Sequence, residues 1–462
     1  MQVSPDVHVV FFPQTHITCI DRRFQSTTHP AHHCVDPNAM ARTKKTTRKH
    51  PPKKDPPKKL KVLFCGMEFE EGWNQTRLAV ERSYLSNTVD IVRCARADVP
   101  TEIVDADLAV PLMTKLDATT LDKATRLAMV LQFGVGLEGV DQDACTARGI
   151  VLARIPSEHT GNAHATAEMA VYLTLAATRR VNQMRESVEG TILGSPMGKT
   201  LHGKNVLIVG WGNVGQKIAT LLRPFGCRLS AARRTSWCDR TTGSTSKTET
   251  EKCLEHKYKG SVPDKLQGVP DADIVILACT QTAENKGMID CKFLSRMKQG
   301  AAIVNVARGG LFNPSDCVDA LESGQLGYLA SDVAWEEPVD PKHKLCAHKN
   351  AYFTPHVGGV TDVSYGCMGN CVKEVAEAMV ERRGYPTQEE WSEQAECETV
   401  RWNGTVVRCV NVPQLEVRFP QWHFLSGPKN NYQPDPGESL RPSKEFEEFP
   451  PVGGEKKRAR TK

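Results

Sequence analysis

Short apolar runs alternate with stretches of helical periodicity from Leu60 onward. Five runs in the first part of the chain are typical of buried strands, and they cover residues 60–66, 89–95, 107–113, 127–134 and 149–156. Residues 74–85 and 121–129 lie between such runs and have the spacing of helices. Strand and helix signals in alternation predict an α/β fold with a parallel sheet covered by helices.

A long stretch over residues 161–188, with small and apolar side chains at helical spacing, predicts a helix that leads into a second α/β unit. Six further strand-like runs follow, at residues 205–210, 227–232, 272–279, 301–307, 328–333 and 351–356. Residues 234–267 are rich in Ser, Thr and Lys, which predicts an inserted surface loop. Residues 364–382 predict a last helix, and the chain beyond residue 384 is only weakly patterned.

The charge of the chain is unevenly distributed. Residues 42–61 hold ten Lys or Arg against one Asp, and residues 455–462 hold five against one Glu, so residues 62–454 carry −7 although the whole chain carries +5. We therefore expect a disordered basic arm over residues 1–59 and a disordered tail over residues 413–462. Nucleic-acid binding by the folded part is not expected, although the basic arms are compatible with nuclear or organellar targeting.

Cysteine usage and hydropathy point to a reducing, aqueous compartment. Sixteen Cys are scattered with no CxxC pair, no apolar run is long enough to span a membrane, and the first twenty residues lack the basic start of a secretory signal. We expect a cytoplasmic protein. No metal site is predicted from His29, His32, His33 and Cys34, because they lie in the disordered arm.

A glycine-rich turn follows the strand run NVLIV directly. It contains Gly210, Gly212 and Gly215, with Asn213 and Val214 between the last two, and it opens a helical stretch. In a dinucleotide-binding turn, the first glycine permits the tight turn, the second admits the pyrophosphate and the third lets helix and strand pack closely. The strand before the turn and the helix after it make a nicotinamide cofactor the expected ligand.

The next strand ends in Arg233 and Arg234, at the position where an acidic residue would accept hydrogen bonds from the adenosine ribose. Guanidinium groups cannot accept these bonds, but they bind a 2′-phosphate through charge-assisted pairs. The alternative is a pair of solvated arginines at a strand end. The pattern predicts a preference for NADP(H), with NAD(H) also possible.

Three later strand runs end in polar groups where ligands bind in open α/β sheets. Arg308 follows the run at 301–307, and His356 ends the run at 351–356. Asp332 lies near the end of the run at 328–333, and Glu337 follows that run. Each alone has a structural explanation, as a surface cap, loop carboxylates or a hydrogen-bonded strand-end histidine. Together, after one dinucleotide turn, they favour a catalytic site.

These stretches resemble a known family. VLIVGWGNVGQKIA, NVARGGLFN, DVAWEEP and TPHVGG occur in the order and near the spacing of the D-isomer-specific 2-hydroxyacid dehydrogenases. LQFGVGLEGVD with ARGIVLARIP, and GNAHATAEMA, resemble the substrate loop and hinge helix of that family. The resemblance covers about residues 60–385. The family includes D-3-phosphoglycerate dehydrogenase and the glyoxylate and hydroxypyruvate reductases.

The resemblance implies a role for each matching residue. Arg308 would hold the substrate carboxylate, His356 would act as acid and base, and Glu337 would pair with that histidine. Asp332 would orient the nicotinamide carboxamide. The remaining assignments are cofactor contacts at Cys279, Thr280, Val306, Ala307 and Gly358, and substrate contacts at Val135 and Gly136.

The resemblance also implies the architecture and the assembly. The fold would comprise two Rossmann-like or flavodoxin-like domains, with the cofactor domain (157–356) inserted in a substrate domain (60–156 with 357–412) and the substrate bound in a cleft that closes by a hinge. The protein would be a homodimer.

The leading functional hypothesis is an NAD(P)H-dependent reductase of small 2-oxo acids, glyoxylate or hydroxypyruvate, that forms D-2-hydroxy acids. One alternative is D-3-phosphoglycerate dehydrogenase, for which the sequence shows no cationic pocket that would take the substrate phosphate. An alternative of another class is a cofactor-sensing, corepressor-like interaction protein.

Overall fold

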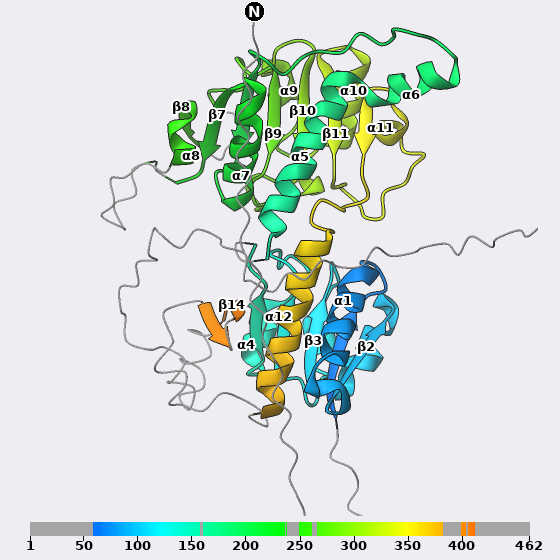
Figure 1. Ribbon diagram of the computed structural model, residues 1–462, viewed down its shortest axis with the longest axis vertical. Helices are drawn as coiled ribbons and strands as arrows, with labels where there is room; N and C mark the ends of the chain where they lie inside the picture. Colours follow the sequence, from blue (N-terminus) through cyan, green and yellow to red (C-terminus); the bar gives the residue numbers. More distant parts are fainter. Residues whose placement is uncertain are drawn as a thin grey trace, which may run out of the picture. The chain divides into compact units, whose positions relative to one another are not determined.

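The computed structural model describes residues 59–157, 160–235, 237, 249–260, 266–381, 399–402 and 405–411. The predicted arm at 1–59, except Lys59, and the predicted tail at 413–462 lie outside the described residues. The described strands form two sheets (Figure 1). None of the described helices combines the length and the apolar character that a membrane span requires.

The first sheet has a core of five parallel strands in the order β2-β1-β3-β4-β5, which is the flavodoxin-like order. All five lie within the predicted runs, as β1 (Leu60–Cys65), β2 (Val89–Cys94), β3 (Leu108–Pro111), β4 (Met129–Gln132) and β5 (Val151–Arg154). Two further strands, β14 (Thr405–Cys409) and β13 (Thr399–Trp402), extend the sheet beyond β5 in antiparallel pairing. The weakly patterned chain after residue 384 gave no signal for them.

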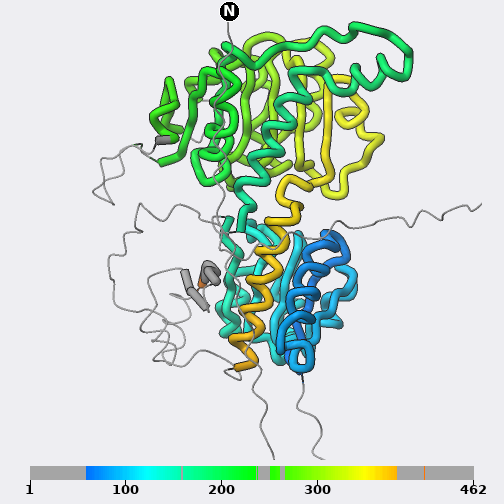
Figure 2. Tube along the Cα trace, in the orientation of Figure 1, coloured from blue at the N-terminus to red at the C-terminus, as the bar shows by residue number. Residues whose placement is uncertain are grey.

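Helices cover both faces of the first sheet because its strands alternate buried side chains. Val62 and Phe64 of β1 pack in a cluster with α12 (Asp362–Glu381), whereas Leu63 and Cys65 pack in a second cluster. In Figure 2 the gold trace of α12 lies beside the blue trace of α1 (Glu70–Glu81), although the two are far apart in sequence. The short helices on the sheet's connections are α2 (Val99–Glu102), α3 (Ala118–Leu121) and α4 (Gln142–Ala147).

The second sheet has seven parallel strands in the order β12-β11-β10-β9-β6-β7-β8. They are β6 (Asn205–Val209), β7 (Arg228–Arg233), β8 (Leu254–Lys259), β9 (Ile274–Leu277), β10 (Ala301–Asn305), β11 (Leu326–Ser331) and β12 (Ala351–Phe353). Counted from β6, the order from β8 to β11 is the 3-2-1-4-5-6 order of dinucleotide-binding folds. The chain reverses its direction of growth between β6 and β9, and this crevice is where such sheets bind ligands.

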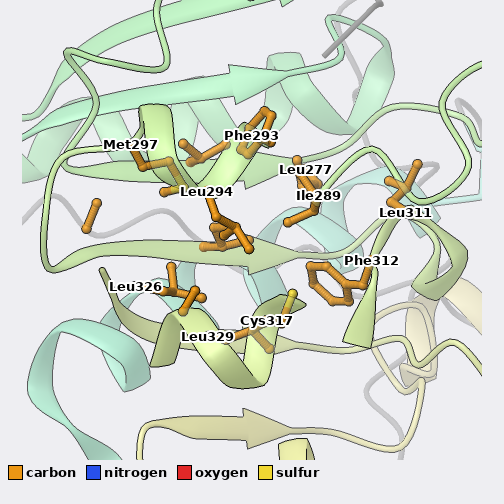
Figure 3. Close-up of a cluster of buried hydrophobic side chains, with 14 of the residues drawn as sticks. Leu277, Ile289, Phe293, Leu294, Met297, Leu311, Phe312, Cys317, Leu326 and Leu329 are labelled. Carbon is orange, nitrogen blue, oxygen red and sulfur yellow. The ribbon is translucent and has the colours of Figure 1, made fainter. Parts of the chain in front are cut away.

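Each face of the second sheet carries its own helices. On one face, α5 (Asn162–Arg179) and α7 (Asn213–Leu222) pack against side chains such as Ile208 and Ile276. On the other face, α9 (Cys291–Arg296) and α10 (Pro314–Glu322) pack against Leu277 and Leu329. Figure 3 shows the cluster on the face of α9 and α10, in which Phe293 and Leu294 pack with sheet residues such as Leu277 and Leu329. The predicted two-unit α/β fold is confirmed.

The predicted surface loop at 234–267 is wrong in part. Within it, α8 (Glu249–Lys252) precedes β8, which pairs in parallel with β7 along the sheet edge. The sequence of β8, LEHKYK, is polar because an edge strand has only part of its surface buried, so a search for apolar runs does not find it. Residues 238–248 and 261–265 of this segment lie outside the description.

Two predicted helices also differ from the structure. The helix expected over 161–188 is interrupted at Arg180, whose φ of 57° is left-handed and cannot continue an α-helix, so α6 (Val181–Glu189) begins after it. The helix expected over 121–129 is absent from these described residues, because α3 ends at Leu121 and turns lead into β4. The predicted last helix, 364–382, corresponds to α12, and a short α11 (Lys344–Ala347) precedes β12.

Candidate active site

The glycine turn between β6 and α7 has a separate steric requirement at each glycine. Gly210 has a φ of 109°, and a Cβ there would lie 2.6 Å from the backbone of Ala278. A Cβ on Gly215 would collide with the carbonyl oxygen of Gly210. Both positions therefore require glycine so that the turn closes and α7 packs on the sheet.

Gly212 differs from the other two because a Cβ there would meet nothing within 4 Å. It caps the N-terminus of α7, whose first backbone N–H groups have no partner inside the helix. An open space in front of unpaired N–H groups suits an anion. The residues around this turn therefore fit the pyrophosphate of a dinucleotide, which would lie on the N–H groups of residues 213–215.

Arg308 is presented by a short turn after β10. Asn305, fully buried, accepts a hydrogen bond from the Ala307 N–H through Oδ1 and donates to the Arg308 carbonyl through Nδ2, both at 2.9 Å. The guanidinium donates from Nε to Glu138 Oε1 at 3.0 Å. A Cβ on Gly309 would overlap the backbone of Ala334, so the turn also needs a glycine at this position. The turn fixes the backbone of Arg308 and directs its side chain into the cavity described below.

His356 and Glu337 form a tight pair. His356 Nδ1 lies 2.7 Å from Glu337 Oε2, and the other carboxylate oxygen accepts the Ala334 N–H at 2.9 Å. Burial raises the pKa of Glu337, but the hydrogen bond and charge of His356, the Ala334 N–H and the charge of Arg308 outweigh burial and lower this pKa overall. Because Glu337 occupies Nδ1, Nε2 is the ring nitrogen left for a substrate.

Asp332 anchors the turn that carries His356. Its Oδ1 accepts hydrogen bonds from the Thr354 hydroxyl at 2.6 Å and the Val357 N–H at 2.9 Å, and its Oδ2 accepts the Gly358 N–H at 2.7 Å. Burial raises the pKa of this carboxyl even though all three bonds favour the ionised form. His356 itself adopts a φ of 57°, so its conformation depends on this network.

A cavity of about 650 Å³ brings these groups together. It lies over the crevice between β6 and β9, and residues of both sheets line it. The predicted site residues in its wall are Val135, Gly136, Gly212, Asn213, Val214, Cys279, Thr280, Val306, Ala307, Arg308, Asp332 and His356.

The other predicted residues do not line this cavity. Gly210 and Gly215 lie within the glycine turn, Glu337 is bonded to His356, and Gly358 donates to Asp332. Arg233 and Arg234 lie at the end of β7. Most of the predicted site residues therefore line this cavity or contact a residue that lines it.

The end of β7 forms a basic and aromatic group. The guanidinium carbon of Arg233 lies 5.3 Å from the ring centre of Trp237, and the Lys257 ammonium of β8 lies 5.2 Å from the same ring. The Trp237 indole is fixed by a hydrogen bond to the Tyr258 carbonyl at 2.8 Å. β8 thus adds a lysine to the two arginines that the sequence singled out.

Several cavity residues were not predicted as site residues. Phe69 packs edge-on against the His356 ring, with centroids 5.7 Å apart, and Arg154 donates to the Val135 carbonyl. Glu138 faces Arg308, and Asn213 donates to Ser157 at 3.3 Å. Glu138 lay within the predicted substrate loop and Arg154 within the predicted strand run at 149–156, although neither was named as a site residue. The contacts of Phe69 and Ser157 arise from tertiary packing.

The comparison with known proteins agrees with this geometry. The family described as "D-isomer specific 2-hydroxyacid dehydrogenase, NAD binding domain" matches residues 171–358. The glyoxylate reductase of Aeropyrum pernix is 32% identical over 267 residues, which cover 56% of this chain and 75% of that protein. The chain belongs to the D-isomer-specific 2-hydroxyacid dehydrogenase family.

Other members are similar over comparable lengths. The D-3-phosphoglycerate dehydrogenase of Mycobacterium leprae is 32% identical over 59% of this chain, which spans only 49% of that protein. The solved structure of an NADPH-dependent glyoxylate/hydroxypyruvate reductase from Sinorhizobium meliloti has the same fold, with a TM-score of 0.57 and 24% identity over 70% of this chain and 94% of that one.

As a D-isomer-specific 2-hydroxyacid dehydrogenase, this protein is an oxidoreductase that uses a nicotinamide cofactor. Its substrate is a small 2-oxo or 2-hydroxy acid. Within the described residues, no group of three or more His, Cys, Asp or Glu could hold a metal ion. The arm histidines and Cys34 lie outside the part of the chain that the structure describes.

Proposed function

We propose that this dehydrogenase reduces glyoxylate and hydroxypyruvate to the D-2-hydroxy acids with NADPH. The observation that carries the proposal is the cavity shared by Arg308, His356 and the open glycine turn, with Glu337 bonded to the histidine from outside the cavity wall. Reduction of a 2-oxo acid needs a cation for the carboxylate, a proton donor for the oxygen at C2 and a hydride. When bound, the reduced nicotinamide supplies the hydride.

Each residue of the chain then has a defined task. Arg308 binds the substrate carboxylate through its planar guanidinium, which matches two carboxylate oxygens. His356 gives the proton on Nε2 to the oxygen at C2 as that oxygen gains charge. Glu337 holds Nδ1 and stabilises the cationic ring before the transfer, and Asp332 keeps the turn of His356 in place. Oxidation of the product runs through the same groups in reverse.

Cofactor choice would depend on the end of β7. Arg233 and Arg234 supply positive charge there, and the strand ends in Arg233 in place of a carboxylate that would accept a ribose hydroxyl. The neighbouring Lys257 is paired with Glu251 Oε2 at 2.9 Å. Under this proposal Arg233→Asp lowers kcat/KM with NADPH by about a hundredfold and lowers the ratio of NADPH to NADH efficiency by more. Equal efficiencies in the unaltered enzyme contradict the NADPH preference without touching the reductase activity.

The direct test is a panel of small 2-oxo acids assayed with NADPH and NADH by absorbance at the nicotinamide band. The expected result is oxidation of NADPH with glyoxylate or hydroxypyruvate and formation of the D product on chiral chromatography. Absence of turnover with every 2-oxo acid would overturn the proposal. Full activity in an enzyme with His356 replaced would overturn the assignment of the proton donor.

We further propose a cytoplasmic homodimer. The end of α6 and the segment after it expose Val188, Ile192, Leu193 and Met197, with exposed fractions from 57% to 97%, and such a row of apolar side chains suits a subunit contact. Sedimentation at micromolar concentration should give about twice the 51.0 kDa chain mass. A monomer at that concentration would contradict the proposed dimer. Recovery of the protein from an organelle fraction would contradict the proposed cytoplasmic location.

A further inference from the structure

Trp237 lies just after β7, beside the arginines on which cofactor choice would depend. Its ring centre is 5.3 Å from the guanidinium carbon of Arg233, within the range in which a cation is attracted to an aromatic face. An arginine side chain has several rotatable bonds, and a contact of this kind reduces the number of conformations that it samples. The indole therefore restricts the direction in which the guanidinium points.

The indole is itself fixed from two sides. Its Nε1–H donates to the Tyr258 carbonyl of β8 at 2.8 Å. Its ring packs on the ring of Trp211, with centroids 5.8 Å apart and planes inclined by 51°. Trp211 is buried and belongs to the glycine turn, between Gly210 and Gly212. Trp237 therefore links the turn that would hold the pyrophosphate to the end of β7.

Lys257 contacts the same ring, but its charge has another partner. Its ammonium lies 5.2 Å from the ring centre of Trp237 and 2.9 Å from Glu251 Oε2. The side chains of this ion pair are both less than a quarter exposed, at 23% and 18%. Since Glu251 compensates the lysine charge, Lys257 serves to support the ring, and the guanidinium of Arg233 is the group that the ring presents.

The backbone and the side chain of Arg233 are both held in place. The Arg233 carbonyl accepts the Gly260 N–H at 3.0 Å, and the residue pairs in register with Lys259 of β8. Its Nε donates to the Thr235 hydroxyl at 2.9 Å. A guanidinium binds phosphate best when its planar fork already has the right direction, because the ligand then does not lose affinity in ordering the side chain.

We propose that Trp237 is a positioning residue that acts through Arg233 and directs its guanidinium toward the 2′-phosphate of the adenosine ribose. This inference rests on the proposed preference for NADPH and deepens it. NADH has a hydroxyl where NADPH has this phosphate. Loss of the ring should therefore weaken binding of the phosphorylated nucleotide and leave binding of the other nearly unchanged.

The test is calorimetric binding of adenosine 2′,5′-bisphosphate and adenosine 5′-monophosphate to the full chain. These probes differ only in the 2′-phosphate, and their binding needs no turnover. Trp237→Leu should weaken binding of the bisphosphate about tenfold and that of the monophosphate by no more than about twofold. Trp237→Phe keeps an aromatic face and should remain within about threefold of the unaltered protein for both probes.

A double substitution shows whether the ring acts through the arginine. Arg233→Ala should itself weaken binding of the bisphosphate, and the addition of Trp237→Leu to it should cause no further loss. In the reductase assay, Trp237→Leu should raise KM for NADPH about tenfold while kcat and the KM for NADH stay within about a factor of two. Trp237→Gln also lacks the ring and gives the same comparison if the leucine variant does not fold.

Trp73 of α1 provides a matched control. Its ring has the guanidinium carbon of Arg93 at 4.4 Å, so Trp73→Leu removes a similar pair from the first sheet. This variant should bind both probes with the affinity of the unaltered protein. A comparable loss of bisphosphate affinity in Trp73→Leu would contradict a specific role for Trp237.

The remaining failures are distinguishable. If the unaltered protein binds both probes equally, the proposed preference for NADPH fails and takes this inference with it. If it prefers the bisphosphate, but the variants without the ring keep that preference or lose both affinities alike, the role of Trp237 is refuted while the preference stands. A further loss in the double variant refutes action through Arg233.

Discussion

The two sheets contribute different kinds of group to the cavity. The second sheet provides Arg308 and His356 on turns that follow its strands, and each turn is held by hydrogen bonds to a buried Asn305 or Asp332. The first sheet provides aromatic and aliphatic surface and a loop, and Glu138 and Arg154 are its charged members of the wall. The difference suggests that one sheet carries the chemistry and the other selects the substrate.

The largest expected effect is on the proton donor of the second sheet. His356→Asn should lower kcat by roughly a thousandfold, because general acid catalysis contributes about 10² to 10⁴. Asparagine tolerates the left-handed conformation of this position better than most residues, so the variant should fold. Steady-state kinetics measures the fall in kcat, and a thermal unfolding scan shows whether the variant folds. A comparable loss from a first-sheet substitution such as Phe133→Leu would break the division of labour.

The next effect concerns the guanidinium. Arg308→Lys keeps the charge but loses the planar pair of donors, and it should lower kcat/KM about a hundredfold. The loss should appear for every 2-oxo acid alike, because all share the carboxylate. The kcat/KM values for the panel of small 2-oxo acids test this expectation. A loss confined to 2-oxo acids with a second anionic group would show that the second sheet selects among substrates and does not bind them all alike.

Glu337→Gln should have an intermediate effect, with kcat reduced roughly thirtyfold because the ring of His356 loses its ionised partner. Its influence on stability depends on pH. The pKa of Glu337 is lowered in the fold from its ordinary 4.5, so its contribution to the free energy of unfolding is present above that value and is lost as the pH falls through the lower, folded pKa.

Urea unfolding at several pH values measures this dependence. The unaltered enzyme should exceed Glu337→Gln in stability near neutral pH, and the difference should shrink as the solution is acidified below about pH 4. A difference that grows on acidification would reverse the sign and refute the ionised pair. Glu336→Gln, at the exposed neighbouring position, serves as the control.

The smallest expected effect lies on the first sheet. Phe69→Leu removes the edge contact with His356 but keeps an apolar wall, so KM should change about threefold while kcat stays within a factor of two. A fall in kcat by a factor of ten or more would show that the first sheet also positions the proton donor. In that case the comparison would have to be redrawn around the His356 ring.

The sequence predicted the groups that depend on short-range chemistry. The glycine turn and the polar residues after the strands lie in contiguous stretches. The steric need at Gly215 is local, since it comes from Gly210, whereas that at Gly210 comes from the distant backbone of Ala278. The family resemblance placed Glu337 beside His356, a contact across nineteen positions that periodicity alone does not reveal.

The remainder depends on contacts that a single sequence does not encode visibly. Phe69 lies in a stretch without a motif, just before α1, and its contact with His356 is one of tertiary packing. β8 was missed because half-exposed edge strands lack an apolar run, and the break at Arg180 was missed because helical periodicity continues on both sides of it. The break results from the left-handed φ of Arg180, and the pattern of apolar and polar residues does not indicate such an angle.

The polar sequence of β8 has a consequence for the behaviour of the protein in solution. A parallel sheet ends in strands whose outer backbone groups can pair with another chain, and one such end of the second sheet is β8 while the other is the three-residue β12. Short length protects β12, and Glu255, Lys257 and Lys259 place charge along β8. Replacing these three residues with valine would make the strand easier to recognise in the sequence, and it would also make the protein prone to edge-to-edge aggregation.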